Sequence, residues 1–342
     1  MAGVFTIARK ELIDIVRSRR FLMLEGVLLL LLFVATYSSG SGGSFMGFIT
    51  PRTPGGGQTS SFLRASGSGF QGIISFIGPI LGIALAAGVI TGEREKGTMK
   101  MLLSQPIFRD NVLNGKFLAI ASTIVLATVL AYVFFMGVGI VALGVTPSMD
   151  EALRLLLITV FSTLYTLAFA SIALLISVMF RRTTTAVIVA LSVFVLFTFA
   201  LSLISYPIAA AVIGPAPQAT FVEQVVERRM PDGTVRNITT QVPSQGYREA
   251  LSEYSQKQQG IMNTIQSISP NYHISRINTF LETLRNPSQS FSIGSSGSQT
   301  TSTTYSLAEG LQLLGVNIIA LSLYLVIPFI ASYITFTRQE EK

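Results

Sequence analysis

Six long apolar stretches, separated by polar segments, run through this chain of 342 residues. A helix needs about 20 mostly apolar residues to cross a hydrocarbon core of about 30 Å, and each stretch comes close to that length or exceeds it. The pattern therefore predicts an all-α polytopic membrane protein with six transmembrane helices. The predicted spans are Phe21–Tyr37, Phe70–Thr91, Phe117–Leu143, Leu155–Phe180, Ala186–Ile213 and Leu311–Phe336.

A basic segment precedes the first span, so a cleaved signal peptide is an alternative to a retained helix. That segment is 20 residues long and carries Glu11 and Asp14, and no A-x-A cleavage site follows the apolar run. These features favour a retained transmembrane helix.

The N-terminal stretch Val4–Arg17 has the periodicity of an amphipathic helix. The apolar residues of one face are Val4, Ala8, Leu12 and Ile15, and the polar residues of the opposite face are Lys10, Asp14 and Arg17. Because a span begins directly afterwards, we predict a cytoplasmic amphipathic helix over residues 1–20 that lies in the membrane interface. A soluble helix that packs on the rest of the protein is the alternative.

Residues 214–310, between the fifth and sixth spans, are numerous enough to form a small α+β extracellular insertion. The elements predicted in it are a short helix at Gln218–Arg229, a hairpin at Met230–Val242 around Pro-Asp-Gly, helices at Tyr247–Ile268 and Tyr272–Leu284 on either side of Ser269-Pro270, and a Ser/Thr-rich tether at Ser288–Ser306. Asn237-Ile238-Thr239 is a glycosylation sequon. The chain thus divides into residues 1–20 (amphipathic helix), 21–213 (spans one to five), 214–310 (extracellular domain and tether) and 311–342 (span six and cytoplasmic tail).

Composition narrows the classes of function. Only 12% of the residues are charged, against about 25% in soluble domains, and the mean hydropathy is +0.59. This combination excludes a disordered chain. The absence of cysteine excludes a disulfide scaffold, a zinc ribbon and an iron–sulfur cluster, and the single histidine, His273, excludes a histidine-rich metal site. We therefore expect no metal in this chain.

The net charge of +7 is distributed unevenly along the chain. If the N-terminus is cytoplasmic, the inner segments carry 14 Lys and Arg residues and the two short outer loops carry 3. The positive-inside rule then places both termini in the cytoplasm and the chain in the cytoplasmic (plasma) membrane. The positive excess is a topology signal with some attraction to anionic membrane lipids, and we expect no nucleic-acid partner.

The most informative polar segment, residues 91–116, lies between the second and third spans. In chain order, the residues that define it are the charged Glu93, Arg94, Glu95 and Lys96, then Gly97 and Thr98, the apolar Met101, Leu102 and Leu103, then Pro106, and finally the basic Arg109 and Lys116. Gly97 is expected to break the chain, and Pro106 to end a short helix that exposes the three apolar side chains. Such a helix, flanked by charge, suits the groove of a partner protein; a solvated charged loop is the alternative.

The same segment carries a resemblance to a known family. The pattern Glu93-x-Glu95-x-Gly97-Thr98, then Leu102-Leu103-Ser104-x-Pro106, then Arg109 and Gly115-Lys116, resembles the signature of permease subunits of type-2 ABC transporters, an exporter-like six-span family. The amphipathic N-terminal helix, the six spans, and Ser269-Pro270 before a helix that leads to span six are also similar to that family's plan. The outer insertion before Ser269 and the extended loop after span one are additions to the plan.

The resemblance implies that Thr98–Gln105 is a coupling helix that docks on a separate ABC ATPase subunit. It further implies that Glu93, Glu95 and Lys96 help transmit ATPase closure to the spans. Arg109 and Lys116 are instead expected to hold the segment against anionic headgroups. Two permease copies would form a homodimer that binds two ATPase subunits.

Motifs for chemistry within the chain itself are missing from the sequence. No G-x-x-x-x-G-K-[ST] sequence occurs, so we expect no enzyme activity and no cofactor here, with ATP and Mg on the partner ATPase. The leading function is the permease of an ABC exporter. The alternative is a non-transporting membrane module that relays ATPase-driven force or signal to an extracellular envelope-binding domain. Deleting Gly214–Ile268 would separate the two, and a membrane-bound enzyme is the least supported class.

Few ionisable or strongly polar residues interrupt the spans. Glu25 is the clear acid among them, and we favour pairing with a nearby basic residue over contact with a substrate. Asn317, with Gln71 and Gln312, is expected to form helix–helix hydrogen bonds. His273 is expected to be a partly exposed helix residue rather than a catalyst.

Overall fold

A computed structural model describes residues 2–40, 68–98, 109–144, 146–229, 235–283, 312 and 314–338. Three predictions fall outside this part of the chain: the coupling helix over most of its length, the tether at Ser288–Ser306, and most of the loop after span one. The chain forms two compact units. The first comprises Met1–Thr198, Ser269–Arg285 and Tyr305–Lys342, and the second comprises Phe199–Ile268 and Asn286–Thr304.

Six described helices are long and apolar enough to cross a membrane, and they fall on the six predicted spans. The helices that form them are α2 (Arg19–Gly40), α3 (Ser68–Ala86) with α4 (Thr91–Glu95), α6 (Arg109–Leu143), α7 (Met149–Met179), α8 (Thr183–Val195) continued by the π-helical η3 (Leu196–Ala200) and α9 (Leu201–Ile213), and α13 (Gly315–Arg338). An all-α polytopic membrane protein is therefore the correct fold class.

The fourth span begins earlier than predicted, at Met149 rather than Leu155. The Ser148 side chain caps this helix by accepting a hydrogen bond from the Glu151 backbone N–H. The Glu151 carboxylate in turn accepts a hydrogen bond from the Ser148 backbone N–H. This capping box satisfies two backbone donors that a helix end otherwise leaves free. Glu151 and Arg154, expected in a loop, are consequently buried in the first turns of α7.

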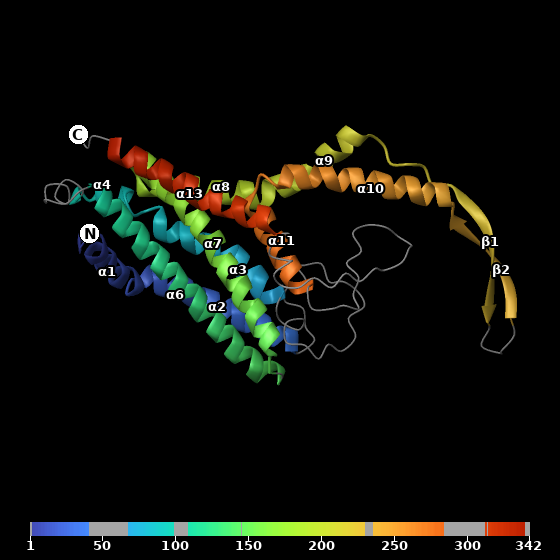
Figure 1. The fold of residues 1–342 in the computed structure, drawn as a ribbon, viewed down its shortest axis with the longest axis horizontal. Helices are drawn as coiled ribbons and strands as arrows, with labels where there is room; N and C mark the ends of the chain where they lie inside the picture. The colour runs from blue at the N-terminus through green and yellow to red at the C-terminus, as the bar shows by residue number, and fades with distance from the viewer. Residues whose placement is uncertain are drawn as a thin grey trace. The chain divides into compact units, whose positions relative to one another are not determined.

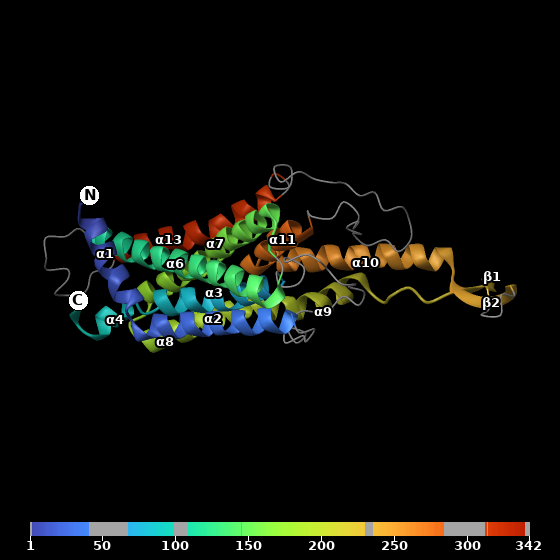
Figure 2. The ribbon, with the colours of Figure 1, turned by 90° about the horizontal axis from the view of Figure 1, so that it is seen from below.

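Helix α7 forms the centre of the first unit, and α3 and α13 pack along it. Figures 1 and 2 show it between its neighbours, with α1, α4 and the carboxyl end of α13 at one end of the bundle. Two glycines of α3 allow the close approach to α7. A Cβ atom at Gly78 would lie 2.5 Å from the Thr166 hydroxyl, and one at Gly82 would lie 2.7 Å from the Thr166 carbonyl oxygen. Small residues that permit such backbone contact are typical of helix packing in membranes.

The N-terminal helix α1 (Ala2–Val16) packs along the first turns of α6. Ala8 is buried in this contact, and a Cβ atom at Gly115 would lie only 2.8 Å from the Ile7 side chain. The face that packs is the predicted apolar face, while Phe5 and Ile13 are exposed on the other side. The membrane position of this helix stays a prediction.

Helix α11 (Pro270–Thr283) packs against α7 and α13. The Ser269 hydroxyl accepts a bond from the Asn271 N–H at 3.1 Å and donates one to the Phe197 carbonyl in the π-helix at 2.8 Å. His273 lies 2.9 Å, Nδ1 to Oδ1, from Asn317 of α13. The helix–helix bond expected of Asn317 is confirmed. The expected partial exposure of His273 is wrong: the residue is 6% exposed, because its side chain packs from α11 against α13, with Tyr272 and Tyr324 beside it.

The second unit contains the hairpin of β1 (Phe221–Arg229) and β2 (Val235–Pro243), and α10 (Gln245–Gln266) packed on α9. The strands pair antiparallel from Phe221 opposite Pro243 to Arg229 opposite Val235. The predicted helix at Gln218–Arg229 is wrong, since this segment supplies the first strand. Its β-branched valines suit a pleated strand. Residues 230–234, where the hairpin turn is predicted, lie outside the described part of the chain. The predicted second strand and the two helices split at Ser269-Pro270 are confirmed.

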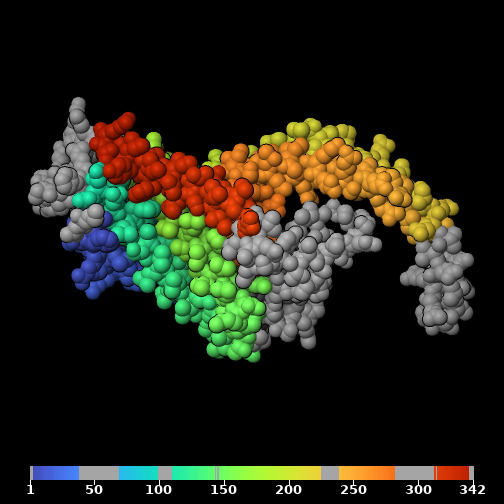
Figure 3. Space-filling model, viewed as in Figure 1, coloured from blue at the N-terminus to red at the C-terminus, as the bar shows by residue number. Residues whose placement is uncertain are grey.

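The outer surface of the first unit is rich in large apolar side chains. Along α13, which is red in Figure 3, Val316, Ile319 and Ile327 are 75%, 63% and 60% exposed. Comparable exposed residues follow α6 and α8, such as Val133 and Ile188. Water would make so large an apolar surface unfavourable, whereas lipid tails solvate it. The fold is therefore that of a multi-pass membrane protein.

Candidate functional site

The candidate site surrounds α4 at the end of the bundle near α1. The chain leaves α4 through Lys96, which caps its carboxyl end, and Gly97, whose φ of +71° ends the helix as predicted. The Thr98 hydroxyl donates to the Glu93 carbonyl at 3.3 Å. Residues 99–108 follow, so Met101, Leu102, Leu103 and Pro106 lie outside the described part of the chain, and Arg109 is described only as the first residue of α6.

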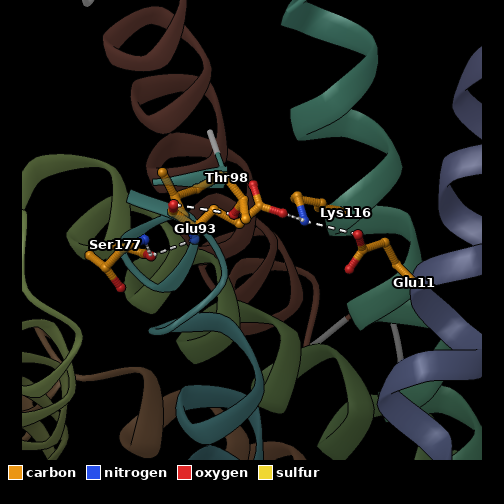
Figure 4. A network of polar contacts seen from close by, with 7 residues as sticks. Glu11, Glu93, Thr98, Lys116 and Ser177 are labelled. Atoms are coloured by element: carbon orange, nitrogen blue, oxygen red, sulfur yellow. Dashed lines mark hydrogen bonds and ion pairs between the residues drawn. The ribbon is translucent and has the colours of Figure 1, made fainter. Parts of the chain in front are cut away.

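A buried lysine links three helices at this site (Figure 4). The Lys116 Nζ atom of α6 lies 2.7 Å from Glu93 Oε1 of α4 and 3.0 Å from Glu11 Oε1 of α1. The lysine side chain is 4% exposed, and the two glutamates are 21% and 24% exposed. A buried ammonium is unfavourable unless charge and hydrogen bonds compensate it, and here two carboxylates do so. From the sequence, we expected Lys116 to hold the segment against lipid headgroups. The structure instead places its side chain inside this network.

Two neighbouring residues of α4 hold the ends of two other helices. Arg94 Nη1 donates to the carbonyl oxygens of Val178 at 2.7 Å and Phe180 at 3.3 Å, where α7 ends. The Glu95 carboxylate accepts bonds from the Thr183 N–H at 3.0 Å and the Thr183 hydroxyl at 2.7 Å, where α8 begins. A cation at a carboxyl end and an anion at an amino end both complement the helix dipole.

A third contact from α7 reaches the junction between α3 and α4. The Ser177 hydroxyl accepts hydrogen bonds from the backbone N–H groups of Ile90, at 3.1 Å, and Thr91, at 3.2 Å. These donors lie where the chain passes from α3 through a turn into α4. Ser177 is fully buried. Sequence reasoning missed both Ser177 and Thr183, since their partners lie more than 80 residues away and no local pattern marks either residue.

The two intramembrane polar residues singled out from the sequence, Glu25 and Asn317, form no hydrogen bond with the described residues of this network. Glu25 belongs to the packed face of α2, in line with buried Phe21, Leu28 and Leu32, and is itself 5% exposed. Neither of its carboxylate oxygens has a hydrogen-bond partner among the residues that the structure describes. Asn317, in α13, bonds to His273 as described above.

The geometry joins α1, α3, α4, α6, α7 and α8 through a compact set of charged and hydroxyl groups. In the described ranges no three His, Asp or Glu side chains gather as a metal site would require. What the arrangement does provide is a mechanical connection. It ties the two chain segments that flank residues 99–108, in α4 and α6, to each other, to α1 and to the membrane helices α7 and α8. The class of protein defined by this fold is a six-span membrane protein with a network of charged and hydroxyl groups at one end of its bundle.

Comparison with known proteins gives the family. The model of the ABC-2 family transporter proteins matches residues 5–340, and the chain belongs to that family. It is also similar to two proteins named "Probable ABC transporter permease protein NosY". The one from Pseudomonas aeruginosa is 29% identical over 155 residues, 45% of this chain and 51% of the relative. The one from Stutzerimonas stutzeri is 27% identical over 132 residues, 39% of this chain and 44% of the relative. The alignments thus reach 51% and 44% of the relatives' lengths.

Proposed function

We propose that this chain is the permease subunit of an ABC exporter and couples ATP hydrolysis by a separate ATPase to movement of a substrate across the cytoplasmic membrane. The observation that carries the proposal is the anchoring of the segment around residues 99–108. Glu93 on its amino side and Lys116 on its carboxyl side meet in one ion pair of 2.7 Å. A force applied to the intervening residues therefore acts on α3 and α6 together.

Family membership supports the need for a partner. Members named as ABC transporter permeases are the membrane-spanning components of such transporters, and this sequence contains no Walker A motif. ATP and Mg would then be bound by the partner ATPase, and this chain would require no cofactor of its own. A homodimer of the permease, with one ATPase on each copy, is the simplest closed arrangement.

The membrane orientation follows from charge and topology together. An even number of spans puts α1 and the carboxyl end of α13 on the same side of the membrane. The basic residues concentrate in segments of this side, so the positive-inside rule makes it cytoplasmic. The part of the second unit that follows the fifth span, from Gly214 onwards, would then be extracellular, and α1 would lie at the inner interface.

The docking of the ATPase can be tested by placing charge in the coupling helix. The double variant Met101→Asp, Leu102→Asp should lose the ATPase during co-purification from cells that express both chains, because an apolar helix that carries two carboxylates no longer fits an apolar groove. Met149→Asp is the matched control: Met149 is 87% exposed at the opposite end of α7 from the α4 contacts. Retention of the ATPase by the double variant at the level of the control would refute the docking assignment.

A further inference from the structure

The contacts of α4 with α7 and α8 suggest a route for motion that neither the sequence motif nor the family explains. The three groups involved are defined here as the α4 clamp: Ser177 on the backbone of Ile90 and Thr91, Arg94 on the end of α7, and Glu95 on the start of α8. All of these bonds join residues that are 84 to 88 positions apart in the sequence.

The clamp is built where the two helices most need partners. Arg182, the N-cap residue of α8, gives no side-chain cap bond, and Glu95 supplies the missing acceptor from another part of the chain. Phe180, at the end of α7, has extended backbone with φ −97° and ψ 157°, so carbonyl groups near it lack helical partners. Arg94 supplies the donor there. The adjacent residues Arg94 and Glu95, which have opposite charges, thus complement the dipoles of α7 at its carboxyl end and of α8 at its amino end.

The contact is also close and specific in shape. A Cβ atom at Gly88 would lie 3.3 Å from the Thr183 methyl group, and one at Gly92 would lie 3.8 Å from its hydroxyl. The Glu95 bonds use both carboxylate oxygens, one on the backbone and one on the hydroxyl. Such two-point bonding fixes orientation as well as distance, as charge-assisted bonds are directional and strong.

We infer that α4 and the turn between α7 and α8, residues 180–182, move as one rigid body, with Ser177 and Thr183 as positioning residues for coupling. This inference rests on the proposed function. Motion imposed on the coupling segment then enters the membrane through α7 and α8 as well as through α3 and α6. Since α7 is the central helix of the bundle, the clamp connects the ATPase to the core of the fold.

Spin-label distances can test the inference, because the chain has no native cysteine. One label pair, at Lys96 and Arg182, spans the clamp; both side chains are exposed, and neither makes a bond of the clamp. A second label pair, at Arg182 and Arg338, reports movement of the turn relative to the carboxyl end of α13. Distances are measured in nanodiscs on the complex with its ATPase, without nucleotide and with ATP plus vanadate.

The expected result has two parts. The distance from Lys96 to Arg182 stays unchanged by nucleotide, while the distance from Arg182 to Arg338 shifts. The variant Glu95→Gln, Thr183→Val loses that second shift while the ATPase stays bound, and Thr183→Ser, which keeps the hydroxyl, retains it. Glu253→Gln is a matched control, since it removes an exposed ion pair with Lys257 in the second unit. In this variant both distances should respond to nucleotide as they do in the protein with an intact clamp.

Three results would overturn the inference: a shift between Lys96 and Arg182, no shift between Arg182 and Arg338, or the same second shift in the double variant. Co-purification separates this failure from that of the proposed function. If the unaltered chain does not bind an ATPase, the proposed function is wrong and the inference with it. If it binds the ATPase and one of the three results is found, only the rigid clamp is wrong.

Discussion

At the scale of single residues, Lys116 determines whether the charges at the site are compensated. Its ammonium group is buried between Glu11 and Glu93, so the network carries two acids and one base. Removing the cation leaves two carboxylates in a half-buried place. Breaking a fully buried pair in this way costs about 3–5 kcal/mol, and we expect the lower end because the side chains of Glu11 and Glu93 are 24% and 21% exposed.

The variant Lys116→Met should accordingly unfold several degrees below the unmodified protein in detergent, as followed by fluorescence-detected size-exclusion chromatography after heating. The triple variant that adds Glu11→Gln and Glu93→Gln carries no buried charge there and should regain most of the loss. Equal stability of the single variant and the unmodified chain would show that the ion pairs do not hold the three helices together.

At the scale of elements, the fifth span depends on its π-helical turn. A π-helix shifts the backbone hydrogen bonds by one residue and often lies at a functional site. Within the π-helical segment Leu196–Ala200, the Phe197 carbonyl oxygen accepts a hydrogen bond from the Ser269 hydroxyl at 2.8 Å. Ser269 lies where α11 begins. Ser269 is 3% exposed, so water does not readily replace it.

Ser269→Ala should therefore destabilise this junction by about 1 kcal/mol, the usual value of one such bond. Faster amide hydrogen exchange at Leu196–Ala200 is the expected sign, measured by mass spectrometry on the purified protein. Ser252→Ala removes an exposed bond to the Glu249 carbonyl in α10 and serves as the control. If exchange at the π-helix is the same in both variants, the hydroxyl does not support the turn.

The elements also show how far sequence reasoning reaches. The six spans follow from long apolar runs, and α10 and α11 follow from periodicity and Ser269-Pro270, because these signals are local. The segment Gln218–Arg229 has both helix-compatible charges and β-branched valines, and only its pairing across the turn decides for a strand. The motif marked Glu93 and Glu95, but their partners Lys116 and Thr183 depend on how distant helices pack. Burial of Lys116 and the role of Ser177 therefore needed the structure.

At the scale of the whole molecule, the charged residues of the Lys116 network and of the α4 clamp lie in the segments that flank residues 99–108, whereas Glu151 and Arg154 are buried at the other end of α7. The described contacts connect α4 to α1 and α6 through Lys116, and to α7 and α8 through the α4 clamp. Such a connection has a purpose if another protein moves residues 99–108. We therefore expect an ATPase subunit to contact these residues.

Site-specific photo-crosslinking tests this claim most directly. A photoreactive amino acid is placed at Leu102 and, as a control in the same apolar class, at Met149, and cells that also express the ATPase are irradiated. We expect an adduct of the chain with the ATPase from position 102 and none from position 149. An assembled, ATP-hydrolysing complex that gives no adduct from position 102 would contradict it.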